Sequence, residues 1–383
     1  MRRWFVAYGA AVICLAACAD DAPDEQGRAR PEPWVVRDPA DAEAVPSRVE
    51  GDLVLSGPHL TGTIVLPQVE SIGKDLLIEY TETLEAVELP ALDRVGVRIS
   101  ISDNRALVRV DLPQLKTTSA VTVRGNLVLE TLVLPEAREA SSFIVSGNLG
   151  LRLVSAPLLE PVASEDDAPG LTPSVSIQNN PALSELDLPA VTDLLRLTVS
   201  DNLSLHDISL PALRRIASLS LLGGLLQTIS LKSLVEVYGE SIFFTSTIDA
   251  PRLTQLDLPN LRWATGLSVA TSSLRSIALP TLESAQELSF ATSTLDRFSA
   301  PKLTKLTGET YDDTVLPRAH EYELGALATG CEHLHLVGGL PDCAFLDIAP
   351  ACTPPDPPSP WTREGCACDP SGDVTLANCP AAP

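Results

Sequence analysis

The sequence predicts an all-β fold, a solenoid of about 11 coils of 21–23 residues with a small disulfide-rich cap at the C-terminal end. Three features of the 383-residue chain point to it: a recurring leucine–proline phrase, an asparagine at a fixed distance from that phrase, and short runs of alternating apolar residues. Such self-similarity is typical of solenoids, in which each repeat buries its apolar face against its neighbours.

The leucine–proline phrase has the form L-x-x-I-x-L-P-x-L-x-x-I, and most copies are 21–23 residues apart, with two longer steps of 32 and 27 residues. Proline has no N–H to donate to a strand ladder, so we expect it to end one strand and to turn the chain at a corner of the coil. Lys232 replaces the proline in one copy; the others contain Pro67, Pro90, Pro113, Pro135, Pro157, Pro189, Pro211, Pro259, Pro280 and Pro301.

An asparagine keeps phase with the phrase, nine residues before its proline, and a threonine stands at the same place in three other repeats. At a fixed corner, such side chains can bond backbone groups that a tight turn leaves unpaired, and stacked copies form a ladder. The alternative is a row of amides that binds a ligand. The asparagines are Asn104, Asn126, Asn148, Asn180 and Asn202, and the threonines are Thr81, Thr271 and Thr292.

Each repeat contains two short apolar alternations, one before the proline and one before the asparagine, as at 97–101 and 195–199. A period of two over so few residues indicates strands, and no stretch has a sustained helical period with caps. At about 4.8 Å per coil, the predicted stack is a rod roughly 50 Å long.

Residues 48–320 resemble the receptor L-domain, a relative of leucine-rich repeats, in the segment GDLVLSG at 51–57 and in the repeat that follows it. The segment also resembles bacterial lipoproteins of this type, particularly from myxobacteria. The resemblance implies a right-handed coil. In animal growth-factor receptors such domains flank a cysteine-rich module, whereas residues 19–330 here contain no cysteine. We therefore do not extend the hormone binding and signalling of those receptors to this chain.

The N-terminus has the pattern of an exported protein. Two arginines precede an apolar run at 4–17, which is shorter than the roughly 20 residues that a transmembrane helix needs. We interpret residues 1–17 as a signal peptide. The segment Leu15-Ala16-Ala17-Cys18 resembles a bacterial lipobox, which implies cleavage before Cys18 and acylation of that residue; an ordinary signal peptide with an incidental cysteine is the alternative.

Residues 18–47 are rich in proline, alanine and acids, and they lack an apolar period. We expect a lipidated N-terminus and a disordered acidic tether. Ala19 stands where enteric bacteria place an aspartate to retain lipoproteins in the inner membrane. This resemblance favours a lipid-anchored protein of the cell envelope, at the outer membrane of a Gram-negative bacterium.

The solenoid is predicted to span 48–325, and a cysteine-rich cap and tail to span 326–383. An even number of cysteines at the end of an exported chain predicts three disulfide bonds, and their pairing stays open. A metal site at Cys331, His333 and His335 is the alternative, but the spacing lacks paired CxxC motifs. The six cysteines are Cys331, Cys343, Cys352, Cys366, Cys368 and Cys379.

The two long steps between phrases indicate insertions, at 160–173 and around 245–250. Insertions in solenoids project as loops, which often bind ligands. The first contains Glu165, Asp166 and Asp167, which we interpret as a solvated acidic loop. Calcium binding by these three acids is the alternative, although no calcium-loop motif supports it.

A net charge of −23 argues against nucleic acid as a partner and against binding to anionic lipid headgroups. The chain lacks the G-x-S-x-G, HExxH, P-loop and GxGxxG motifs. Ser204, His206 and Asp207 are close in sequence, but a catalytic triad needs convergence in three dimensions. We therefore predict no catalytic residue, metal or cofactor.

The predicted function is a non-catalytic surface module that binds a protein or a glycan. A structural envelope protein without a specific ligand is the first alternative, and a β-helical polysaccharide-acting enzyme is the second. Sixteen aromatic residues are a thin supply for sugar stacking. The outward positions predicted for the coils do not decide between binder and spacer, because they are repeat-like: Arg98, Ser100, Arg196, Thr198 and Ser200.

Overall fold

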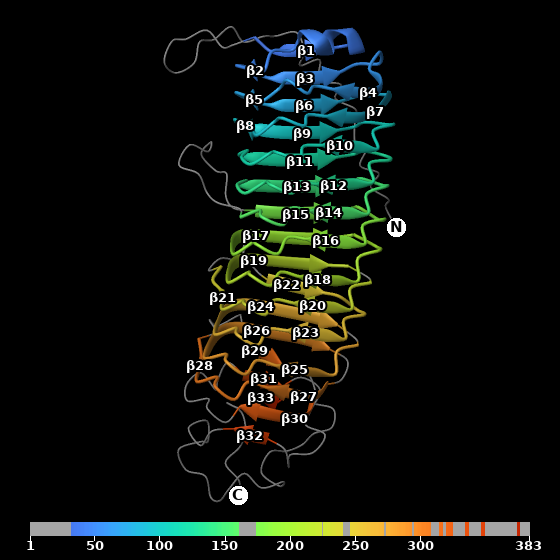
Figure 1. The fold of residues 1–383 in the computed structure, drawn as a ribbon. Helices are drawn as coiled ribbons and strands as arrows, with labels where there is room; N and C mark the ends of the chain where they lie inside the picture. Colours follow the sequence, from blue (N-terminus) through green and yellow to red (C-terminus); the bar gives the residue numbers. More distant parts are fainter. Residues whose placement is uncertain are drawn as a thin grey trace, which may run out of the picture.

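The computed structural model is a parallel β-solenoid of about 11 turns with almost no helix (Figure 1). It describes residues 32–160, 174–223, 225–239, 246–271, 273–292 and 295–307, and strand segments at 314–316, 319–324, 334–336, 346–348 and 374–375. Every described strand pairing is parallel except that of β33 with β31. The predicted all-β solenoid is confirmed, and the cysteines of the predicted cap lie outside the described residues.

One long sheet runs the length of the rod, and its strands follow one another as rungs in chain order (Figure 1). They are β1 Trp34–Val36, β3 Leu53–Ser56, β6 Leu76–Glu79, β9 Arg98–Ser102, β11 Ala120–Arg124, β13 Ser142–Ser146, β15 Ser174–Gln178, β17 Asp193–Ser200, β19 Arg215–Leu222, β21 Glu236–Val237, β22 Ser246–Asp249, β24 Trp263–Thr271, β26 Ser284–Thr292, β28 Lys305–Leu306, β29 Thr314–Leu316, β31 Leu334–Leu336 and β33 Val374–Thr375. The apolar residue of each alternation points inward, so neighbouring coils share one continuous core.

Shorter strands form the other sides of the coil. The side before the proline contains β4 Thr61–Val65, β7 Thr83–Glu88, β10 Arg109–Asp111, β12 Thr131–Val133, β14 Leu153–Ser155, β16 Glu185–Asp187, β18 Asp207–Ser209, β20 Thr228–Ser230, β23 Gln255–Asp257, β25 Ser276–Ala278, β27 Leu295–Ser299, β30 Ala319–Leu324 and β32 Leu346–Ile348. A third, narrow side contains β2 Arg48–Val49, β5 Ser71–Ile72 and β8 Arg94–Val95, and single bridges at residues 94, 117, 139 and 160 continue it.

The leucine–proline phrase forms a β-turn. In ten of the eleven copies the residue before the proline accepts a bond from the backbone N–H three residues later, at 3.1–3.4 Å. Proline suits the second position of such a turn because its ring fixes φ near the required value and its missing N–H is not needed there. The residue before the proline and the second residue after it are buried apolar residues, usually leucine, as at Leu89 and Leu92.

The N-terminal boundary needs a correction, because the predicted disordered tether to residue 47 already contains folded structure. Strand β1 pairs in parallel with β3, and the 3-10 helix η1, Pro39–Ala44, follows it with Asp38 as its N-cap. Val36 is fully buried, and the side-chain amide of Gln68 donates to the carbonyl of Val45 at 3.0 Å. This segment covers the apolar end of the first coil. A strand of only three residues gives no detectable alternation within an acid- and proline-rich segment, so the sequence did not predict it.

Coil-type parallel pairing continues past residue 325, into the segment predicted as the C-terminal cap. Strand β31 pairs in parallel with β29, and β32 pairs in parallel with β30. The sequence contains a signal for this, since Leu346-Asp-Ile-Ala-Pro350 repeats the alternation that precedes a phrase proline. The six C-terminal cysteines, Cys18 and the acidic residues of the first insertion lie outside the described residues.

Candidate functional site

The five predicted asparagines stack directly on one another at the corner where the long sheet ends, and we call them the asparagine ladder. In the first four, the side-chain Nδ2 donates to the Oδ1 of the asparagine on the following coil at 2.9–3.2 Å, and the backbone N–H of the same residue donates to that Oδ1 at 3.0–3.3 Å. Nδ2 also reaches a carbonyl of the preceding coil at 2.8–3.1 Å. The structure thus brings all five together in the arrangement expected from their spacing.

The ladder amides are internal. Four of the five asparagines have no exposed surface, and Asn202 is 6% exposed. At one end Thr81 joins the ladder, since its Oγ1 donates to Asn104 Oδ1 at 2.7 Å. At the other end Gly223 stands where the next asparagine would, so no side-chain acceptor continues the series. These contacts pair buried backbone groups at the corner and leave the amides no face for a ligand.

A left-handed residue precedes each ladder position, and the sequence analysis did not identify it. The column consists of Tyr80, Asp103, Gly125, Gly147, Asn179 and Asp201, with φ between 53° and 68°. Glycine, asparagine and aspartate are the residues that tolerate this conformation. The sequence pairs Asp-Asn, Gly-Asn and Asn-Asn therefore indicate a left-handed residue before each ladder asparagine. Tyr80 is the exception in the column.

The outer face of the long sheet carries a row of hydroxyl side chains along its middle, with Ile144 as the single apolar member. Its members are successive register partners: Ser100, Thr122, Ile144, Ser176, Thr198, Ser220, Thr247, Ser268 and Ser289. This part of the face is repeat-like, as the sequence predicts.

The same row changes character at its N-terminal end. Register partners continue from Ser100 to Leu77, Val54 and Val35, all three partly exposed. Because side chains two residues apart share a face, Asp52 and Asp75 flank these apolar residues on one side, and Glu79 does so on the other. We call Val35, Val54, Leu77, Asp52, Asp75 and Glu79 the N-terminal patch.

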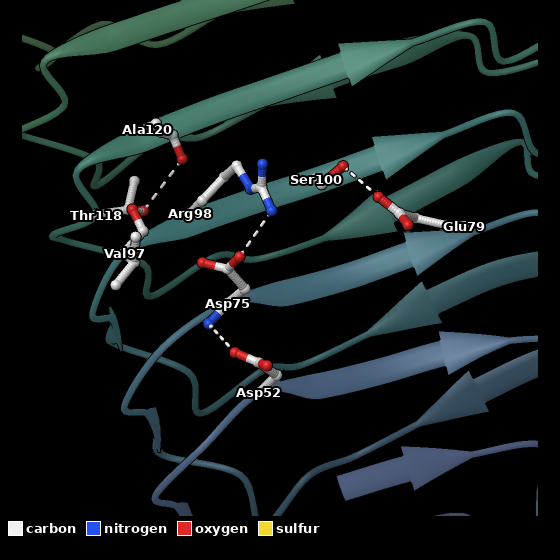
Figure 2. A network of polar contacts seen from close by, with 8 residues as sticks. All are labelled: Asp52, Asp75, Glu79, Val97, Arg98, Ser100, Thr118 and Ala120. Carbon is white, nitrogen blue, oxygen red and sulfur yellow. Dashed lines mark hydrogen bonds and ion pairs between the residues drawn. The ribbon is translucent and has the colours of Figure 1, made fainter. Parts of the chain in front are cut away.

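A polar network fixes the charged side chains beside this patch (Figure 2). Arg98 Nη2 donates to Asp75 Oδ2 at 2.8 Å, and the backbone N–H of Asp75 donates to Asp52 Oδ1 at 3.1 Å. On the other side Ser100 Oγ donates to Glu79 Oε1 at 2.6 Å. Asp75 Oδ1 is buried and has no hydrogen-bond partner among the described residues. The patch therefore combines an apolar centre with carboxylates held in fixed positions.

A second cluster of aromatic and charged side chains lies at the start of three strands of the long sheet, β19, β21 and β24. The guanidinium of Arg262 lies 4.5 Å from the centre of the Trp263 ring and bonds Glu283, and that of Arg215 lies 5.2 Å from the Tyr238 ring and bonds Glu236. Burial raises the pKa of Tyr238. Each arginine is paired with a glutamate of the next coil, so the charges of the cluster are neutralised within it. We interpret these pairs as surface contacts between neighbouring coils.

The structure does not assemble the sequence-adjacent Ser204, His206 and Asp207 into a triad. Ser204 Oγ donates to the carbonyl of Pro181 at 2.7 Å, and His206 is exposed. Within the described ranges, no group of three or more His, Cys, Asp or Glu side chains is placed to hold a metal ion. The same ranges contain no helix long and apolar enough to cross a membrane.

In comparisons with known proteins, no protein family, no curated protein and no solved structure matches the chain.

Proposed function

We propose that this chain is a lipid-anchored protein of the bacterial cell envelope, of the receptor L-domain type, whose solenoid is a non-catalytic module that binds a protein or a glycan. Cys18 is the proposed lipid attachment site, and the C-terminal cysteines are proposed to form a disulfide-bonded cap. The N-terminal patch is the proposed contact surface.

One observation supports the binding role above the others. A spacer needs only repeat-like side chains on its outer face, as found from Ser100 to Ser289, whereas a binder needs non-repeating residues gathered in one place. The N-terminal patch is such a place, because an apolar row replaces the hydroxyl row over three consecutive strands. An apolar centre with a polar rim is the usual anatomy of a recognition surface.

The test of the binding role is capture from an envelope extract by immobilised residues 19–383. Leu77→Lys places a charge in the centre of the patch, and its long stem can still cover the sheet while the ammonium reaches water. Thr198→Lys is the matched control in the same row. We expect the wild-type and Thr198→Lys proteins to capture the same partner, and Leu77→Lys to capture at least tenfold less.

Two outcomes would count against the proposal: an absence of any partner that withstands washing would contradict the binding role, and equal capture by the two lysine variants would contradict the assignment of the N-terminal patch. The first favours a structural envelope protein, and the second places the binding surface elsewhere on the solenoid.

The anchoring proposal has its own test. In the native host, Cys18→Ser should remove the thiol that carries the lipid, so the protein should leave the membrane fraction or remain unprocessed. Two or three acyl chains hold a protein firmly, so the loss should be nearly complete. Cell fractionation with a blot against the solenoid measures it. Normal processing together with normal membrane retention would refute the assignment of Cys18.

A further inference from the structure

Large apolar side chains project from the corner that the asparagine ladder supports. Leu149 and Leu203 are each 55% exposed, Leu127 is 44% exposed, and Val128 is 41% exposed. Tyr80, on the same corner, is 65% exposed. We call these five residues the corner ridge; they include the three most exposed large apolar side chains in the described part of the chain.

The corner ridge is straight because the ladder beneath it is straight. Leu127, Leu149 and Leu203 each follow a ladder asparagine directly, and Pro181 occupies the equivalent place between the last two. At about 4.8 Å per coil, the ridge extends roughly 24 Å from the coil of Tyr80 to that of Leu203. A corner of a solenoid is its convex edge, so these side chains project from an outward curve. On the coil of Asn104 the position equivalent to Leu127 is the exposed Arg105, which separates Tyr80 from the three leucines.

Tyr80 occupies a position that the fold itself disfavours for a tyrosine. Its φ is 56°, where other coils of the column place glycine, asparagine or aspartate. A bulky residue in the left-handed region costs conformational energy, and such strain is typically retained where the side chain has a function. Because the ring contributes little to the core at 65% exposure, the function concerns something outside the chain.

We propose that the corner ridge rests on the surface of a phospholipid bilayer with zwitterionic headgroups. Its shape favours a fluid surface over a protein partner, because side chains on a convex edge can enter the boundary of a bilayer without a complementary opposing face. Its chemistry also fits, since leucine and valine enter the acyl boundary and tyrosine settles at the level of the headgroups.

The charges near the ridge select the type of lipid. Both signs occur on this corner: Arg105 is paired with Glu82 at 3.9 Å, and Asp103, Arg124 and Asp201 are also exposed. The chain as a whole carries a net charge of −23, which repels an anionic membrane. Contact along the ridge would lay the solenoid along the membrane. It would do so independently of the proposed acylation of Cys18 and of the N-terminal patch.

Vesicle flotation with unacylated residues 19–383 tests this contact. We expect the wild-type protein to float with phosphatidylcholine vesicles, and admixture of phosphatidylserine to reduce the floated fraction. The double variant Leu149→Ser/Leu203→Ser should reduce partitioning at least tenfold. The control Val65→Ser/Val133→Ser removes two exposed valines from the side of β4 and β12, and it should leave partitioning unchanged.

Tyr80→Asn separates a lipid contact from a structural role. Asparagine accepts the left-handed conformation, so this variant should raise the melting temperature by about 2 °C while it lowers partitioning several-fold. A destabilised Tyr80→Asn protein would show that the ring supports the fold, and would count against the proposal.

Three results would overturn the proposal: no flotation of the wild-type protein with phosphatidylcholine, equal flotation of the serine double variants, or stronger flotation with phosphatidylserine. A dimer that the wild-type protein forms and Leu149→Ser/Leu203→Ser does not, without flotation, would instead assign the ridge to a second copy of the chain. None of these results depends on Leu77, so failure here is distinguishable from failure of the binding role.

Discussion

Replacing Asn148 with alanine is expected to lower the free energy of unfolding by about 3 kcal/mol or more. Asn148 lies mid-ladder, and its Oδ1 accepts both the backbone N–H and the side-chain amide of Asn126, at 3.1 and 2.9 Å. Its own Nδ2 donates to the carbonyl of Val123 at 3.1 Å. Truncation leaves these buried groups unpaired, and each unpaired group costs about 1–3 kcal/mol.

Chemical denaturation measures the change, and hydrogen exchange locates it. Solenoid coils depend on their nearest neighbours, so exchange should accelerate most in β11, β13 and β15. Asn260→Ala is the matched control, because its exposed amide makes one bond, to the carbonyl of Lys232 at 2.7 Å. If the two variants differ by less than about 0.5 kcal/mol, the ladder does not hold the corner as described.

Replacing Gly96 with alanine is expected to cost about 3–5 kcal/mol or to prevent folding. A Cβ on Gly96 would lie 2.0 Å from the carbonyl oxygen of Gly73, and one on Gly73 would lie 2.2 Å from that of Glu50. Both obstacles are backbone atoms of the preceding coil, and neither can move without opening the parallel stack. The amide of Gly96 is itself bonded to the carbonyl of Ile72 at 2.8 Å.

Gly266→Ala is the control for the glycine prediction. A Cβ at Gly266 meets nothing within 4 Å, and its backbone does not require glycine. Its unfolding free energy should stay within about 0.5 kcal/mol of the wild-type value, or rise slightly because the unfolded chain loses freedom. Similar denaturation midpoints for Gly96→Ala and Gly266→Ala would contradict the close contact between these coils.

The repeat architecture was predictable because it depends on signals within one repeat. The proline turn, the two short alternations and the asparagine at its fixed distance each repeat in phase. The buried ladder followed from the same reasoning, since an amide at a fixed corner must find partners on the coils next to it. Sequence distance alone placed all five asparagines correctly.

The remaining features depend on contacts between coils, which no single repeat contains. Strand β1 is only three residues long, and it forms because its backbone can pair with the edge strand β3. The need for glycine at Gly96 comes from a carbonyl on another coil. The N-terminal patch appears only when the register aligns Val35, Val54 and Leu77 in one row, because each residue alone is an ordinary strand residue.

The claim that the N-terminal patch is a recognition surface is tested most directly by equilibrium binding of the captured partner to the wild-type, Leu77→Lys and Thr198→Lys proteins. The two substitutions add the same side chain to the same row of the same sheet, on strands far apart along the rod. We predict that Leu77→Lys weakens binding at least tenfold and that Thr198→Lys changes it less than twofold. Equal affinities for all three proteins would contradict this assignment.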